Sequence, residues 1–142
     1  MLYSEGESMP KTYLNPPTLF NSLQYGFSQI VSAQGGATVY LSGQVAWDEQ
    51  QRITGEGDLG VQTRQALKNI DTAMQAAGGS LADVVSLRIY FVDDFRADMH
   101  HISAALKEFF PAEHAPATTW IGVRSLADAS FLIEIEAIGV IE

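Results

Sequence analysis

The last quarter of the chain constrains the fold most, because its two segments have the composition of β-strands. Residues 116–126 and 131–141 are rich in β-branched and aromatic residues, and the short, turn-like segment 127–130 separates them. Side chains alternate along a strand, so one face of the second segment is apolar and the other carries Glu134 and Glu136 among large apolar residues. Such a mixed face suits neither a dry core nor a solvated surface. We therefore expect helices on one face of the sheet and another subunit on the other.

β-Forming residues dominate three earlier segments, 27–32, 38–45 and 83–92. The last two again have one apolar and one mixed face. The sequence Gln-Gly-Gly at 34–36 predicts that the first two segments pair as a hairpin. Residues 1–24 contain three prolines and several Asn and Ser, so they are expected to form an irregular arm with one short strand at 11–14.

Two segments have apolar residues at helical spacing. The first runs from an N-cap at Asp58 to about Ala77, where a glycine pair ends it. The second can be capped by Asp93 or Asp94 and ends at about Phe109, before a proline. Two helices can cover only one face of the sheet, which predicts an α+β fold.

Composition excludes several classes of protein. The net charge of −9, from 17 acidic and 8 scattered basic residues, disfavours nucleic acid as a partner. The absence of cysteine excludes disulfides and fits a cytoplasmic localisation. No basic cluster followed by an apolar run marks the N-terminus as a secretory signal, and no apolar run reaches the ~20 residues of a membrane span. We expect a soluble protein with no membrane partner.

Several stretches together resemble the RidA/YjgF family, also called the L-PSP endoribonuclease family, from about Tyr13 to Ile141. The matching segments are 26–29, 39–44, 65–70, 116–117 and 133–137. The resemblance implies one RidA-like domain over residues 1–142 with a chorismate-mutase-like fold, in which two helices cover one face of a mixed sheet. It also implies a homotrimer formed through the other face, with small-molecule clefts between subunits and no cofactor.

The best-known members of this family hydrolyse reactive enamines and imines to ketoacids and ammonia. In them an arginine directly after the Pro-Ala pair grips the substrate carboxylate through two hydrogen bonds. Here that position is Thr118, which offers one hydrogen bond and no charge. The resemblance also places Phe27 at a family tyrosine, Met99 at an asparagine and Trp120 at a small residue or cysteine. It implies that Glu134 keeps its role of orienting the hydrolytic water.

The cleft is therefore expected to be more apolar than in the deaminases. Seven residues are predicted to line it: Phe27, Gly43, Gln44, Val45, Thr118, Trp120 and Glu134. Thr118 and Trp120 are expected on the mixed strand face, with Met99 nearby, and Gly43 would admit close approach of a ligand to the backbone. Glu134 is the predicted catalytic residue.

Three functions remain open. The first is an enamine or imine hydrolase whose substrate has no carboxylate. The second is a non-catalytic trimer that binds a small metabolite or a protein partner in the same clefts. The third is an endoribonuclease, which the acidic charge ranks last.

Other charged residues have structural interpretations. Glu136 is two residues from Glu134 and is expected to pair with a neighbour such as Arg88 rather than to act in catalysis. His100 and His101 point roughly 100° apart on a helix and do not easily bind one ion, and no acidic residue completes a ligand set with them or with His114. No metal site is expected.

Overall fold

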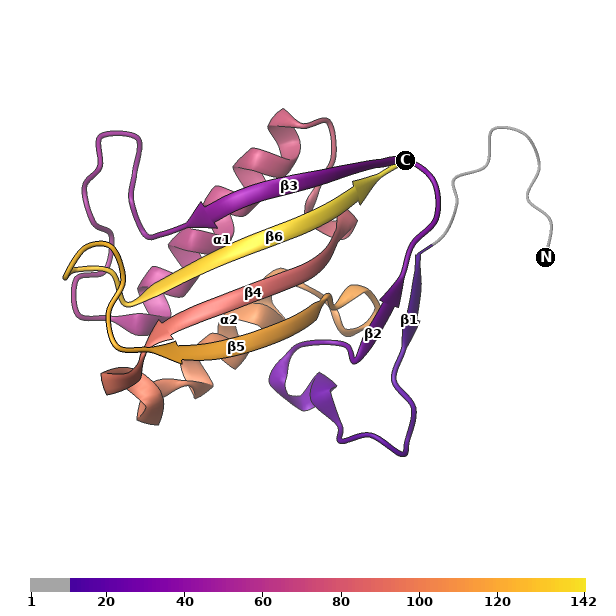
Figure 1. The fold of residues 1–142 in the computed structure, drawn as a ribbon, viewed down its shortest axis with the longest axis horizontal. Coiled ribbons are helices and arrows are strands. Elements are labelled where there is room, and N and C mark those ends of the chain that lie inside the picture. The colour runs from indigo at the N-terminus through magenta and orange to yellow at the C-terminus, as the bar shows by residue number, and fades with distance from the viewer. Residues whose placement is uncertain (1–10) are drawn as a thin grey trace.

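A computed structural model describes residues 11–142, so the first ten residues of the expected arm lie outside the described part. Four strands form the central sheet, in the order β3 (Ala37–Gln44), β6 (Ile133–Ile141), β4 (Val84–Val92) and β5 (Ala117–Val123). The strand β6 pairs antiparallel with both β3 and β4, whereas β4 and β5 run parallel. The sheet is therefore mixed, as predicted (Figure 1).

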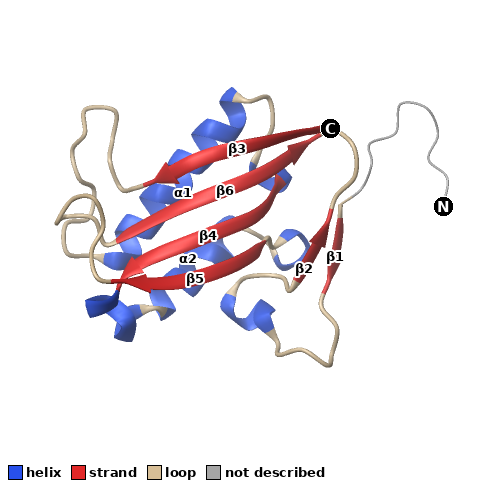
Figure 2. Cartoon of the chain, in the orientation of Figure 1, coloured by secondary structure: helices blue, strands red, loops and turns tan. Residues whose placement is uncertain are grey.

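Both helices, α1 (Leu59–Ala76) and α2 (His100–Phe109), cover the same face of this sheet (Figure 2). The core lies between them and the alternate residues of β4 and β6 that face inward, which are Leu87, Ile89, Phe91, Ile133, Ile135 and Ala137. Asp58 caps α1 by accepting a hydrogen bond from the Val61 amide, and the Gly79 amide bonds back to the Met74 carbonyl at the other end. These observations confirm the α+β class and the bounds predicted for the first helix.

The predicted hairpin across residues 34–36 is wrong. The strand β2 (Ile30–Ser32) pairs with β1 (Thr12–Leu14) in a separate two-stranded sheet, which confirms the short strand predicted at 11–14. The partner of β3 is β6, nearly a hundred residues away along the chain. The reason is length: β3 has eight residues and can pair along most of the long apolar strand β6, whereas β2 has only three residues. Gly35 and Gly36, both with positive φ, connect the two sheets.

The second helix also begins differently from the prediction. A 3₁₀ helix, η3 (Asp93–Asp98), comes first, and Met99 occupies the N-cap of α2 without a side-chain hydrogen bond. Neither Asp93 nor Asp94 caps α2, because η3 separates both residues from its first turn, and the Asp93 carboxylate binds the side chain of Arg96. Three further 3₁₀ turns are η1 (Ser22–Tyr25), η2 (Leu81–Asp83) and η4 (Ala112–His114).

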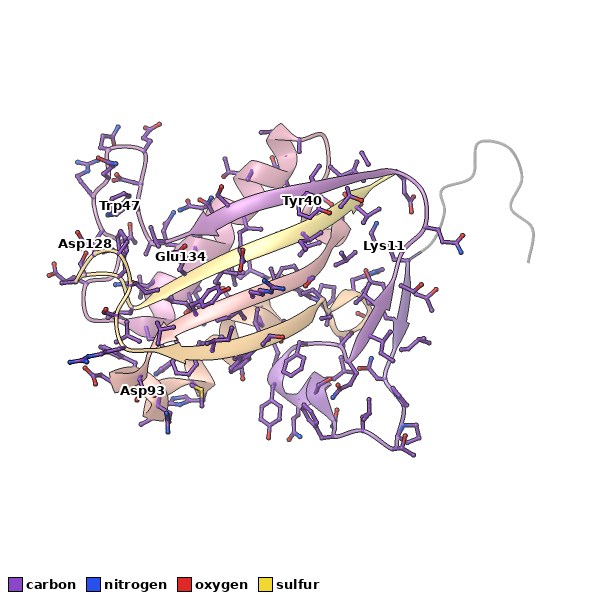
Figure 3. All side chains as sticks on the ribbon, viewed as in Figure 1. Lys11, Tyr40, Trp47, Asp93, Asp128 and Glu134 are labelled. Carbon is purple, nitrogen blue, oxygen red and sulfur yellow. The ribbon has the colours of Figure 1, made fainter. Side chains whose placement is uncertain are left out.

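The face of the sheet turned away from the helices has no cover within residues 11–142. It carries Tyr40, which is 78% exposed, beside Arg88, Glu136 and Ile138. This face is toward the viewer in Figure 3, where Tyr40 lies on β3. It is the mixed face that the sequence predicted. Within the described residues, no helix has the length and apolar character that crossing a membrane requires.

Candidate functional site

The predicted site residues lie on both faces of the sheet. In the parallel pairing of β4 and β5, Thr118 is opposite Leu87 and Trp120 is opposite Ile89, and residues in register point to the same face. Leu87 and Ile89 are buried beneath the helices. Thr118 and Trp120 therefore face the helix side, and their predicted place on the mixed face is wrong. The register of β5 against β4 decides which face these side chains point to, and the sequence does not specify that register.

The first group of residues surrounds a hollow at the edge strand β5. This aromatic hollow has a volume of about 400 Å³ and is lined by Tyr25, Phe27, Met99, Thr118 and Trp120. The rings of Phe27 and Trp120 are 6.0 Å apart between centroids. The predicted trio of Phe27, Thr118 and Trp120 is thus brought together, with Met99 beside it as expected.

A hydrogen bond within the aromatic hollow fixes the polarity of Thr118. The indole Nε1–H of Trp120 donates to Thr118 Oγ1 over 2.9 Å. Because the oxygen accepts this bond, the hydroxyl proton of Thr118 stays available as a donor. The hollow therefore offers two neutral donors, the hydroxyls of Thr118 and Tyr25, in an aromatic surrounding, and no charged side chain of residues 11–142 lines it.

Tyr25 is a member of the aromatic hollow that the sequence reasoning missed. It lies in the turn η1, and Phe20 contacts both Tyr25 and Phe27, with ring centroids 6.5 Å and 6.1 Å away. Gly26, with φ of +95°, lets this turn approach α2 so closely that a Cβ there would be 2.9 Å from the Cβ of Leu106. Three aromatic residues within eight positions of an irregular segment were the available signal.

The second group lies on the open face, at the end of β3 and the start of β6. Figure 3 labels Glu134 on β6. Its side chain lies so close to Gly43 that a Cβ at Gly43 would collide with the Glu134 carboxylate. The register between β3 and β6 shifts between Leu41 and Gln44, which opens the ladder at this glycine. Gly43, Gln44 and Glu134 are therefore brought together.

Helix α1 holds the backbone that follows Gly43. The Asn69 amide donates to the carbonyls of Val45 and Trp47, at 2.9 Å and 3.0 Å, and Gln65 donates to the Asn69 side-chain oxygen. These bonds turn the Val45 carbonyl toward the helix. Val45 is thus joined to Gly43 and Gln44 through the chain, and its carbonyl is bound by a helix residue on the other side of the sheet.

The two glutamates of β6 have different surroundings. Glu136 accepts a hydrogen bond from the Tyr90 hydroxyl at 2.7 Å and lies 3.9 Å from Arg88, which confirms the predicted pairing. This hydrogen bond raises the pKa of Tyr90 above its ordinary value. The Glu134 carboxylate has no hydrogen bond or ion pair to any side chain of residues 11–142. Glu134 is thus the carboxylate that is free to act on a ligand or a water molecule.

The histidines show no geometry of a metal site. The rings of His100 and His101 are 4.1 Å apart between centroids on the exposed surface of α2, and His114 packs edge-on against Tyr13. Within residues 11–142, no three side chains of the metal-binding kinds are grouped.

The structure therefore brings the seven predicted residues into two separate groups. The aromatic hollow lies on the helix side of β5, and the Gly43–Glu134 group lies on the open face of β6, with β4 between those strands. One small ligand cannot contact both groups of the same chain.

Comparison with known proteins places this arrangement in a family. The family model described as Endoribonuclease L-PSP matches residues 21–141. A protein from Dermatophagoides farinae named 2-iminobutanoate/2-iminopropanoate deaminase is 36% identical, covering 82% of this chain and 86% of its own. A RutC family protein from Pyrococcus horikoshii is 39% identical over 79% of this chain and 84% of its own.

A solved structure of a Rid family protein of unknown function from Yersinia pestis is similar over nearly its whole length. It is 38% identical, has a TM-score of 0.88, and covers 94% of this chain and 100% of that chain. Its likeness extends over the mixed sheet and both helices described above. The chain therefore belongs to the endoribonuclease L-PSP family, that is, to the RidA/YjgF family.

Proposed function

We propose that the protein is a homotrimer that hydrolyses an imine or enamine in clefts between its subunits. One subunit supplies the aromatic hollow, and the neighbouring subunit supplies Glu134 and the backbone at Gly43. The separation of these two groups on opposite faces of one sheet supports the proposal, because only a second chain can complete the site. The uncovered mixed face of the sheet offers the surface for that assembly.

Each group has a role in the proposed reaction. Glu134 accepts a proton from a water molecule, whose oxygen attacks the imine carbon and forms a carbinolamine. Glu134 returns this proton to the imine nitrogen, and transfer of the carbinolamine hydroxyl proton to the same nitrogen then breaks the C–N bond and releases a carbonyl compound and ammonia. An enamine enters the same sequence after its carbon gains a proton and it becomes the imine. The hydroxyl of Thr118 donates a hydrogen bond to the ligand, and the backbone of 43–45 orients it.

The free carboxylate of Glu134 is the observation that carries this proposal. A glutamate on a half-buried face normally finds a partner, as Glu136 does in Tyr90 and Arg88. Glu134 instead lies against the backbone of a glycine, where a water molecule and a small ligand can approach it. The name of the 36% identical relative, an iminobutanoate and iminopropanoate deaminase, supports the same class of reaction.

The substrate we propose has no carboxylate at its reacting carbon. Thr118 stands where the family resemblance places an arginine, and the hollow around it contains only aromatic, thioether and hydroxyl side chains. Loss of a two-hydrogen-bond ion pair costs several kcal/mol of carboxylate recognition. We therefore expect about hundredfold lower efficiency with 2-aminoacrylate than an arginine-bearing homologue shows, measured by ketoacid release from imines that an amino acid oxidase generates.

The test of the reaction compares Glu134→Gln with the wild type on a panel of neutral imines and enamines. We expect turnover by the wild type and a loss of at least about a hundredfold in the variant. Glu136→Gln is the matched control, because its carboxylate is already bound by Tyr90. Equal turnover by Glu134→Gln and wild type would contradict the catalytic role of Glu134.

The second candidate is a trimer that binds a metabolite without converting it. The hydrogen bond between Trp120 and Thr118 favours it, since the Thr118 hydroxyl already has a partner within the chain. Binding of the imines without turnover by either protein would support this alternative. An endoribonuclease role ranks third, because a chain with a net charge of −9 repels RNA.

A further inference from the structure

A second, larger hollow of about 510 Å³ adjoins the aromatic hollow and shares Tyr25, Met99 and Trp120 with it. It continues along the exposed side of α2, where Ser103 and Lys107 follow Met99 at intervals of one helical turn. We call this hollow the α2 groove. From Met99 to Lys107 it extends about 12 Å along the helix axis. The proposed site is therefore long enough for a ligand with two separated groups.

The wall of the α2 groove opposite the helix is built by the turn η1. The close approach of Gly26 to Leu106 seats this turn on α2 and places Gln24 and Tyr25 across from Ser103 and Lys107. The Gln24 amide is itself held by a hydrogen bond to the Asn21 carbonyl at 2.9 Å. The groove is thus formed by α2, the turn η1 and Trp120 of β5. His100 also lines it, and no described carboxylate does.

Lys107 brings an uncompensated positive charge to the α2 groove. Five of the eight lysines and arginines, all of which lie within residues 11–142, form ion pairs with described carboxylates. Lys107 is not among them. The neighbouring carboxylate of Glu108 is bound by Arg64 at 2.8 Å and so does not neutralise it. Within residues 11–142, Lys107 is thus a cation without an ion-pair partner at the end of a groove that no carboxylate lines, and in so acidic a chain it marks a place for an anion.

We infer that the α2 groove binds an acidic group of the ligand at Lys107, remote from the aromatic hollow that holds the ligand's apolar part. The inference rests on the proposed function and specifies its substrate class: an aromatic or extended apolar compound with a carboxylate or phosphate at its far end. The hydroxyl of Ser103, one turn before Lys107 on the same side of the helix, adds a hydrogen-bond donor for the anion. Acid recognition is thus moved from the reacting carbon to the opposite end of the ligand.

The experiment uses stable probes, so that its outcome does not depend on turnover. Calorimetry compares 3-phenylpropanoate, 3-phenylpropanamide and 2-phenylethyl phosphate on the wild-type protein. We expect one or both anions to bind about 1.5-fold to fivefold more tightly than the neutral amide at low salt, which is the range for a solvent-exposed ion pair. This preference should decrease as the salt concentration rises. The anion that binds more tightly identifies the acidic group.

Three variants locate the charge. Lys107→Gln should remove the preference for the anions, and Lys107→Arg should restore it. Lys68→Gln is the matched control, because Lys68 is an exposed lysine on α1 that likewise has no described ion-pair partner. Equal affinity for the amide and both anions, or equal effects of the Lys107→Gln and Lys68→Gln changes, would overturn the inference. Anion preference at Lys107 without hydrolysis of any imine would leave the inference standing and contradict the proposed reaction.

Discussion

The contact between Gly43 and Glu134 determines where the free carboxylate lies. Gly43→Ala places a Cβ where the end of the Glu134 side chain now is, and a flexible side chain can rotate away at little cost. We expect the free energy of unfolding to change by less than about 1 kcal/mol, while imine turnover falls about a hundredfold. Urea unfolding and steady-state kinetics measure the two quantities. Full turnover by Gly43→Ala would show that the position of the carboxylate does not matter.

The hydrogen bond between Trp120 and Thr118 stabilises the wall of the aromatic hollow. Thr118→Val keeps the shape of the side chain but leaves the half-buried indole N–H without its acceptor, which we expect to cost about 1 kcal/mol. Urea unfolding measures the change. Thr119→Val is the control, because Thr119 is exposed. Its free energy of unfolding should lie within about 0.5 kcal/mol of the wild-type value. Equal effects of the two substitutions would mean that the bond contributes nothing to stability.

The hydrogen bond from Tyr90 to Glu136 makes the free energy of unfolding depend on pH in the alkaline range. It raises the pKa of Tyr90 in the folded protein above its ordinary value of 10, so the folded state holds the proton more tightly than the unfolded state. The resulting stabilisation is complete below pH 10 and is lost as the pH rises through the folded-state pKa. We expect Tyr90→Phe to remove a tyrosine that ionises above pH 10, which a titration of tyrosinate absorbance measures. An unchanged alkaline titration in Tyr90→Phe would contradict this assignment.

At the scale of secondary-structure elements, Gln62 connects α1 to two loops. Its fully buried amide donates to the carbonyls of Gly55 and Ser130 and accepts from the Leu132 amide, at 2.9 to 3.1 Å. Gln62→Leu leaves these buried groups unpaired, and we expect the free energy of unfolding to fall by about 3 kcal/mol. Gln75→Leu, at an exposed position of the same helix, should cost less than about 0.5 kcal/mol. Similar unfolding midpoints for the two variants would refute this role.

The elements differ in how far their sequences determine them. The first helix was predictable because its cap, apolar spacing and terminal glycines all act within a few residues of one another. The pairing of β2 was not, because a Gly-Gly connection permits a hairpin but cannot show that β3 has a longer partner in β6. The prediction that Asp93 caps α2 was wrong for a similar reason, since the sequence did not show that the Asp93 carboxylate binds Arg96.

At the scale of the whole molecule, we expect a partner subunit to cover the open face of the sheet. We expect sedimentation equilibrium at micromolar concentration to give three times the 15.4 kDa mass of the chain. Ile138→Asp, which places a charge in the middle of that face, should dissociate the assembly. Lys68→Asp on the opposite side of the molecule should not. A monomeric wild-type protein would refute both the trimer and the site between subunits.

The candidate site was predictable in its membership but not in its layout. The family resemblance selected five residues that the structure divides into two groups. Phe27, Thr118 and Trp120 line the aromatic hollow, whereas Gly43 and Glu134 lie together on the open face. That division follows from the register of β5 against β4, which no residue type specifies, because Thr118 and Trp120 suit either face of a strand. Lys107 was not predicted, since its importance depends on the absence of a partner and on a turn from another part of the chain.

The central position of β6 also governs the order in which the chain can fold. During synthesis, β3 and β4 are made long before β6, yet each must pair with β6 and they do not pair with each other. Until residue 141 has been added, both strands have unpaired backbone groups and exposed apolar side chains. Contacts between residues so far apart in sequence also form slowly. Before β6 is made, β3 therefore has no strand partner and β4 has only β5, and the nine residues of β6 are needed to join the two parts of the sheet.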